Sequence, residues 1–312
     1  MYPMKIIPAF KDYLWGGTRL ETEFGFKSGL AKTAEAWILS AHEDGENIIS
    51  NGIYSGKSFK ALIGEHPDFI KKGFSGDFPL LIKFIDAKDN LSVQVHPNEE
   101  YAVLNENDHG KTEAWYILDA EEDARLILGF KEKISREKLK EVIESETLLE
   151  YANSLNVKKG EIYFIPSGTM HAIGKGIVIC EVQQNSNVTY RLYDYGRIQN
   201  GKKRPLHIEK ALDVLDFEPY AYENSISGID SDTANLVTCD IFSLNRINIS
   251  GEKKFIAADD SFVSLVCVDG NGEIHFKGEK YMIKKGDSYF IPASSGEYIL
   301  SGRMTVLETK IP

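Results

Sequence analysis

The sequence has only three cysteines, Cys180, Cys239 and Cys267, and they lie far apart in apolar stretches. An odd number of widely separated cysteines does not provide the disulfide framework of a small secreted protein. The pattern indicates buried thiols in a reducing compartment, with a catalytic cysteine as the lesser alternative. We therefore expect a cytoplasmic protein.

The chain also lacks long hydrophobic runs and an excess of positive charge. No run reaches the roughly 18 apolar residues of a membrane-spanning helix, so we expect no membrane segment. The start, MYPMKIIPAF, has two prolines and no long apolar core, unlike a secretory signal. Its 36 basic and 47 acidic residues give a net charge of −11, which argues against nucleic acid or an anionic membrane as a partner. An anionic small substrate would need a local basic pocket.

Short apolar or alternating runs, separated by Gly, Asn, Asp and Pro, dominate the chain. Examples are AEAWILSA, LLIKFIDA, LSVQVHP, EAWYILDA and GIVICEVQQ. Many short strands with frequent turns predict an all-β barrel or sandwich. Helical patterns are few, at 58–70, 98–105 and 207–217. The longest covers 133–155, with apolar residues at 3–4 spacing, and predicts a small helical insertion near 131–156.

One strand–turn–strand unit occurs twice. VKKGEIYFIPSGTMHAI (157–173) is echoed by IKKGDSYFIPASSGEYI (283–299), but His171 in the first copy corresponds to Glu297 in the second. The polar stretch 223–236 separates the two β-rich blocks. We therefore predict a catalytic domain over 1–225 and a metal-free β domain over 226–312.

The first copy carries a spacing that points to a metal. Gly160, Pro166, Gly168 and His171 fit G-x5-P-x-G-x2-H, a turn, a strand and a bend followed by an inward-facing imidazole. This spacing resembles part of the cupin motif, whose fold is a jelly-roll barrel with a metal inside. The resemblance implies two cupin-like jelly-roll barrels, the first with the helical insertion.

Upstream residues supply the remaining metal ligands in this prediction. Gln94 and His96 are two apart in SVQVHP, so their side chains share one face of a strand. Glu113 follows on another strand, with Lys111 on the same face. Two imidazoles, a carboxylate and an amide oxygen suit Zn²⁺, with Mn²⁺, Fe²⁺ or Co²⁺ as competitors. Amide oxygens are poor zinc ligands, which makes Gln94 the weakest member of the set.

Four ordered motifs identify a family. LSVQVHPNEEYA, GKTEAWYIL, IPSGTMHAIG and EVQQNSNVTYRLYDYGR together resemble the type I phosphomannose isomerases in their short bacterial form. That resemblance implies interconversion of mannose 6-phosphate and fructose 6-phosphate with one zinc ion per chain. It also implies a sugar phosphate as the partner, and we expect a monomer or a weak homo-oligomer.

Carried over position by position, the resemblance assigns roles to individual residues. The metal ligands are Gln94, His96, Glu113 and His171, and the essential arginine is Arg191. Ser92 matches a serine near the substrate phosphate, and Lys111 matches a lysine that lines the site. Some long-form members have a histidine just before that lysine, where this chain has Gly110 and places His109 one position earlier.

The proton-transfer base stays open between metal-bound hydroxide, Lys111 and Glu35. Lys83 is a further candidate for gripping the phosphate, and Trp15 and Glu35 are expected to frame the pocket. Two other functions compete with the isomerase. One is an Fe²⁺-dependent cupin dioxygenase, and the other is a non-catalytic sugar-phosphate-binding cupin.

Overall fold

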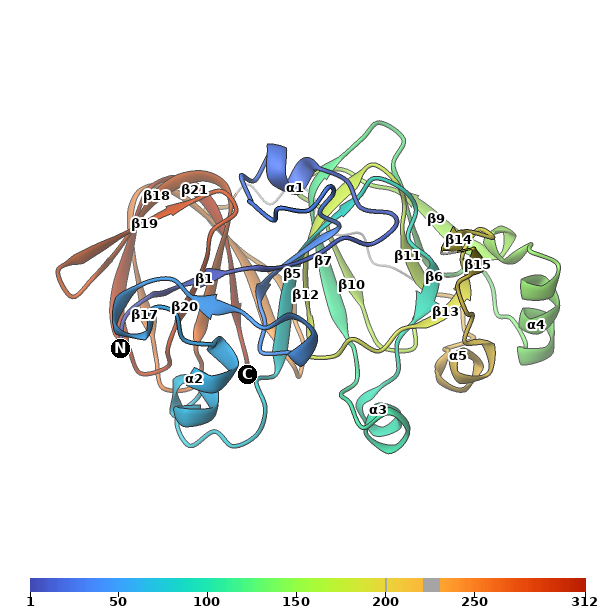
Figure 1. Ribbon diagram of the computed structural model, residues 1–312, viewed down its shortest axis with the longest axis horizontal. Helices are drawn as coiled ribbons and strands as arrows, with labels where there is room; N and C mark the ends of the chain where they lie inside the picture. Colours follow the sequence, from blue (N-terminus) through green and yellow to red (C-terminus); the bar gives the residue numbers. More distant parts are fainter. Residues whose placement is uncertain (200, 221–230) are drawn as a thin grey trace.

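The computed structural model describes residues 1–199, 201–220 and 231–312. The molecule consists of two β modules placed side by side along its longest axis (Figure 1). The predicted all-β, cupin-like class is confirmed, since sheets form the body of both modules and the helices lie at their periphery. No helix in the described part of the chain is long and apolar enough to cross a membrane.

The first module is built from two facing sheets. The six-stranded sheet has the order β10-β7-β12-β5-β3-β2, and the five-stranded sheet has the order β13-β6-β11-β8-β9. The strands of the first are β2 (Ala9–Lys11), β3 (Glu35–Leu39), β5 (Leu80–Ala87), β7 (Glu113–Ala120), β10 (Ile162–Ile165) and β12 (Ile177–Gln184). Those of the second are β6 (Val93–Val95), β8 (Arg125–Phe130), β9 (Ala152–Asn156), β11 (His171–Ile173) and β13 (Tyr190–Tyr193).

The second module is one eight-stranded sheet, and its long strands extend through much of that module. Its strands are β1 (Met4–Ile7), β4 (Ile48–Ile49), β16 (Thr233–Thr238), β17 (Ser243–Ala257), β18 (Val263–Phe276), β19 (Glu279–Lys284), β20 (Ser288–Ile291) and β21 (Gly296–Lys310). The N-terminal β1 pairs with β20, so the start of the chain is part of this sheet. The predicted boundary at 225/226 lies outside the described residues, and the domain division stays a prediction.

Each sheet of the first module is covered on both faces, which explains the near-continuous apolar strands. One core lies between the two sheets and includes Trp115, Ile179 and Leu128. A second core joins the outer face of the six-stranded sheet to the second module, where Phe84 and Phe290 are both fully buried. Burying apolar surface on both faces ties the two modules together.

The helices are α1 (Arg19–Thr22), α2 (Phe59–Glu65), α3 (Glu99–Glu106), α4 (Arg136–Glu144) and α5 (Ile208–Val214). Side chains cap three of them: Ser58 accepts from Ala61 N, Asn98 from Tyr101 N and Ser135 from Lys138 N. Helices α4 and α5 cover the outer face of the five-stranded sheet (Figure 1).

The predicted helical insertion is shorter than its apolar pattern suggests. Helix α4 ends at Glu144, and Ala152–Asn156 forms strand β9 rather than further helix. The strand pairs with β8, where Leu126 lies opposite Leu155. Edge pairing in the sheet therefore outweighs the local helical pattern of this segment.

Candidate active site

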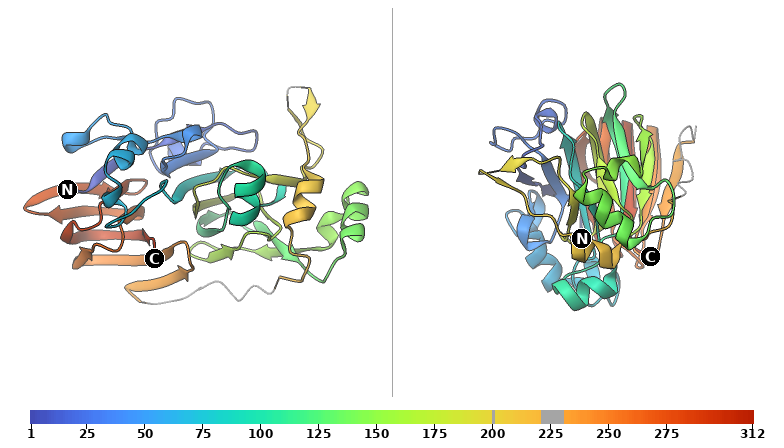
Figure 2. Two further views of the ribbon diagram at one scale, coloured as in Figure 1. Left: turned by 90° about the horizontal axis from the view of Figure 1, so that it is seen from below. Right: turned by 90° about the vertical axis from the view of Figure 1, so that its right-hand side faces the viewer.

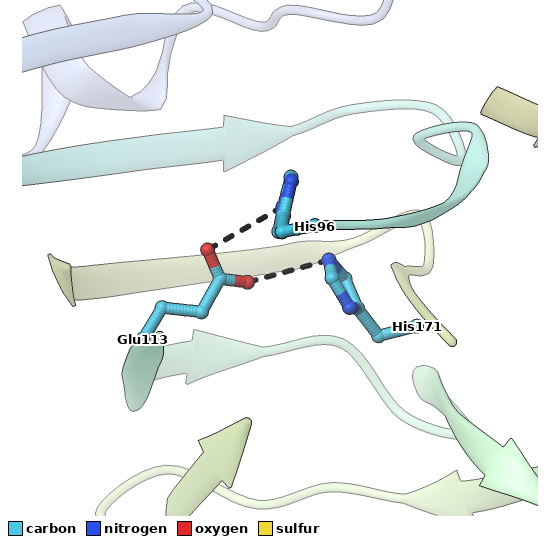
Figure 3. Close-up of side chains that lie close together, drawn as sticks. All are labelled: His96, Glu113 and His171. Carbon is cyan, nitrogen blue, oxygen red and sulfur yellow. Dashed lines mark ion pairs between the residues drawn. The ribbon is translucent and has the colours of Figure 1, made fainter. Parts of the chain in front are cut away.

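Three predicted metal ligands converge between the two sheets of the first module. His96 follows β6, Glu113 begins β7 and His171 begins β11. Their nearest ligand atoms all lie within 4.8 Å of one another, and all three side chains are buried. Figure 3 shows the Glu113 carboxylate pointing at both imidazoles. Residues 75 positions apart in the chain meet because β11 pairs with β6, next to His96.

Backbone carbonyls fix the orientation of both imidazoles. His96 Nδ1 lies 2.7 Å from the Val188 carbonyl oxygen, and His171 Nδ1 lies 2.9 Å from the Thr169 carbonyl oxygen. A carbonyl can only accept, so each Nδ1 carries the proton and each Nε2 keeps its lone pair. The two Nε2 atoms lie 3.6 Å and 3.3 Å from the oxygens of Glu113. This arrangement of outer hydrogen bonds is typical of metal-binding histidines.

The chemistry of this donor set fits a divalent cation. Both Glu113 oxygens are buried without a hydrogen-bond donor, and they face two imidazole lone pairs. Burial lowers the pKa of His171 to about 4 and, together with the Lys111 charge, lowers the pKa of His96. The imidazoles are therefore neutral and competent to bind a metal at neutral pH, and a cation would relieve the repulsion between the electron-rich atoms.

Gln94 and Lys111 lie beside this triad. Gln94 Nε2 is 3.4 Å from His96 Nε2 and 3.3 Å from His171 Nε2. Rotating the terminal amide by about 180° would exchange its nitrogen for an oxygen that can coordinate a cation. Lys111 Nζ lies 3.1 Å from His96 Nε2 and 3.3 Å from Glu113 Oε2, so its positive charge already faces the donor set.

A pocket of ≈ 490 Å³ opens directly above the triad. Seven residues that the sequence predicts for the site line it: Trp15, Glu35, Lys83, Ser92, Gln94, Lys111 and Arg191. Their convergence follows from strand alternation, because inward positions of both sheets face the same space. The pocket has the size expected for a small-molecule site.

One wall of the pocket contains a carboxylate that the sequence analysis misses. Trp115, Glu181 and Lys83 are neighbours on three adjacent strands of the six-stranded sheet. Glu181 accepts a hydrogen bond from Trp115 Nε1 at 2.8 Å, and its Oε2 lies 3.2 Å from Lys83 Nζ. Its position within the apolar run IVICEV was the available clue, because charged groups are rarely buried without a partner.

The charges along this wall depend on one another. Lys83 is 4% exposed and also lies 3.8 Å from Glu35 Oε2. Burial disfavours its charge, but Glu35 and Glu181 outweigh burial and raise the pKa of Lys83. Burial likewise favours protonated Glu181, yet Lys83 and Lys111 lower the pKa of that carboxyl. The structure therefore holds an ionised carboxylate in the wall of the pocket.

Arg191 occupies the opposite wall. It lies directly across from Gln94 in the pairing of β13 with β6. Its Nε is buried without a hydrogen-bond partner. Three further lining residues, Tyr13, Arg204 and His207, have no place in the sequence analysis. They come from loops whose spacing carries no motif.

Gly110 has a structural reason. A Cβ at this position would lie 2.5 Å from the backbone nitrogen of Glu99, so no side chain fits there without moving the start of α3. His109 points away, with Nδ1 2.9 Å from Glu99 Oε1 and its side chain 44% exposed. Neither residue places a base in the pocket of this chain.

Comparison with known proteins gives consistent matches. The family model for the catalytic domain of type I phosphomannose isomerase matches residues 4–127, and the mannose-6-phosphate isomerase cupin domain matches 232–310. The chain is 39% identical over 306 residues to mannose-6-phosphate isomerase ManA of Bacillus subtilis, covering 96% of each chain. It is 38% identical to mannose-6-phosphate isomerase of Streptococcus mutans, over 94% of this chain and 93% of that protein.

Solved structures agree with these matches. A crystal structure of mannose 6-phosphate isomerase from Bacillus subtilis superposes with a TM-score of 0.91 at 36% identity, covering 99% of each chain. Mannosephosphate isomerase structures from Archaeoglobus fulgidus and Salmonella typhimurium share the fold at 23% identity or less, with TM-scores of 0.81 and 0.80. The chain belongs to the type I mannose-6-phosphate isomerase family.

Proposed function

We propose that this protein interconverts mannose 6-phosphate and fructose 6-phosphate, with one zinc ion per chain held by Gln94, His96, Glu113 and His171. The observation that carries the proposal is the buried triad of two imidazoles and a carboxylate at the floor of a polar pocket. Relatives that are 38–39% identical over nearly the whole chain are named as isomerases of this sugar phosphate.

The donor set favours zinc. Two neutral imidazoles and one carboxylate, with a fourth position for an amide oxygen or a ligand, match the preferences of catalytic Zn²⁺ sites. A fold neighbour at 19% identity is described as bound with zinc and yttrium, but that likeness shows the fold alone. The argument for zinc therefore rests on the donors of this chain.

Moving a proton between C1 and C2 of the sugar requires a base close to the metal. We assign this role to Glu181, whose Oε2 is buried, lacks a hydrogen-bond donor and belongs to a carboxyl with a lowered pKa. Glu35 is less suited, because its Oε2 accepts from Trp37 Nε1 at 2.6 Å. Glu181 would take the proton from one carbon at Oε2 and return it to the other, contributing about 10²–10⁴-fold.

Negative charge develops on the sugar oxygens while the proton is on the base. A divalent ion bound at the triad supplies Lewis-acid stabilisation of that charge. Arg191 and Lys111 face the same space, and their cations would stabilise it further and position the hydroxyl groups. Ser92 and Trp15 would complete the walls around the sugar.

The competing functions fit the site less well. A dioxygenase needs a redox-active metal but has no use for the paired Lys83 and Glu181 in the wall. A sensor that only binds its ligand has no need of an ionised carboxylate beside two cations. Residues 226–312 are proposed to form a structural module, since the side chain of Glu297 is 63% exposed and pairs with Lys254.

The test is a coupled assay of fructose 6-phosphate formation from mannose 6-phosphate, before and after treatment with a chelator. We expect activity that chelation abolishes and that zinc restores. Oxygen uptake measured on the same samples addresses the dioxygenase. An enzyme that is inactive with stoichiometric zinc, or whose activity persists after the metal has been removed, would contradict the proposal.

A further inference from the structure

The mouth of the pocket carries a local excess of positive charge in a chain of net charge −11. Arg197, Lys202, Lys203 and Arg204 lie on or beside the hairpin of β14 (Ile198–Gln199) and β15 (Lys202–Lys203). The hairpin projects from the body of the molecule (Figure 2). Of these four cations, only Arg204 lines the pocket.

The segment after the hairpin is tied to the strand that carries Arg191. His207 N donates to the Arg191 carbonyl oxygen at 2.8 Å, and Arg191 N donates to His207 Nδ1 at 3.2 Å. Arg191 in turn lies across from Gln94. The pocket therefore runs from the metal donors at the floor, past Arg191, to Arg204 and His207 at the mouth.

The hydrogen bonds at the mouth leave positive charge uncompensated. Arg204 donates from Nε and Nη2 to the two carboxylate oxygens of Asp194, at 2.7 Å and 2.6 Å. Arg197 pairs with the same Asp194, so one carboxylate serves two guanidinium groups. Burial and the nearby Arg204 lower the pKa of Arg191, which reflects cations packed close to one another. An anion is the missing partner.

His207 adds a neutral donor beside these cations. Its Nδ1 accepts a hydrogen bond from a backbone N–H, so in the neutral ring the proton lies on Nε2. Burial lowers the pKa of this imidazole, which favours the neutral form. The side chain makes no capping hydrogen bond to α5, which leaves Nε2–H available to a ligand.

We propose that Arg204 and His207 bind the phosphate group of the substrate at the mouth of the pocket. Guanidinium groups are well suited to phosphate, and Asp194 holds this one in a fixed orientation. Lys83 is poorly placed for the same task, because a phosphate beside it would also face Glu35 and Glu181. The inference rests on the proposed function, since it names the end of the site that takes the phosphate.

The test compares R204Q with K203Q, which removes one positive charge from an exposed position on the same hairpin. A lost hydrogen bond to a charged group corresponds to roughly a tenfold or greater change in affinity. We expect R204Q to raise KM for mannose 6-phosphate by about this factor with little change in kcat. K203Q should change KM slightly, and salt should screen its effect. H207A should raise KM by a smaller factor than R204Q.

Inorganic phosphate is the second probe. It should inhibit competitively, with an inhibition constant that rises in R204Q in parallel with KM. R204K, which keeps the charge, should lie between wild type and R204Q and provides the comparison if R204Q does not fold. Equal KM values in R204Q, R204K and K203Q, or unchanged phosphate inhibition, would overturn the assignment. Wild-type turnover, measured separately, shows whether the isomerase itself is the failure.

Discussion

Replacing His171 with alanine should remove the metal and the activity together. The imidazole is fully buried, its Nε2 lies 3.3 Å from Glu113 Oε1, and its orientation depends on the Thr169 carbonyl. Without it, one imidazole and one carboxylate remain as strong donors, because the amide of Gln94 is a weak ligand.

The size of the effect can be bounded. Loss of a group that only orients a metal ligand lowers affinity by about 10–100-fold. Loss of a ligand itself should therefore cost at least about 100-fold, or roughly 3 kcal/mol of binding free energy. Zinc affinity is measured by competition with a chelator of known strength, zinc content by elemental analysis and turnover by the coupled assay. Thermal unfolding checks that the variant is folded.

His109→Ala is the matched control. That imidazole is 44% exposed and pairs with Glu99 outside the pocket, so its loss should leave zinc content and kcat close to wild type. Full zinc occupancy in His171→Ala, with wild-type affinity, would show that the triad is not the metal site. A large loss of kcat in His109→Ala would show that this residue acts in the reaction after all.

Three further predictions follow from the same pocket. Glu181→Gln keeps an acceptor for Trp115 but cannot take a proton, so kcat should fall about 10²–10⁴-fold with zinc content unchanged; an unchanged kcat would exclude Glu181 as the base. Arg191→Ala should likewise retain zinc and lose about 10²–10³-fold in kcat, and wild-type turnover would refute its role. In metal-free protein, His171 has a pKa lowered from 6.5 to about 4, so the unfolded chain binds more protons in this window. The free energy of unfolding should therefore fall as the pH is lowered from 6.5 to 4, by up to about 3 kcal/mol from this group, and urea titrations of chelated His171→Ala should lack that part.

The metal donors were predictable because each lies in a motif with a strict spacing. Gln94 and His96 share a face by strand alternation, and the bend at Gly168 precedes His171. Gly168 has a φ of 86°, a conformation that favours glycine. These features are local in the chain, so the sequence alone carries them.

Features that depend on pairing between distant strands could not be predicted in the same way. Glu181 reaches the pocket because β12 lies between β5 and β7, and no local pattern specifies that order. Arg204 and His207 enter the site through backbone hydrogen bonds to Arg191. The segment around Leu155 shows the converse, because its helical pattern yields to pairing with β8.

The repeated unit shows why only one copy presents an imidazole to the barrel interior. Gly160 and Gly286 have φ values of 89° and 93°, so both copies begin with the same turn. The second copy has two left-handed residues near its bend, Ser294 and Gly296, with φ of 60° and 86°. The position that corresponds to Gly296 in the first copy has no such conformation.

This difference shifts the alternation of the following strand by one residue. His171 is buried, whereas Glu297 is exposed and its neighbour Tyr298 is buried instead. A shift of one residue moves a side chain to the opposite face of the strand. Glu297→His should therefore place its imidazole in solvent and leave the zinc content at the wild-type value by elemental analysis. A second zinc ion in this variant would show that the backbone, and not the missing ligand alone, permits a metal in the second module.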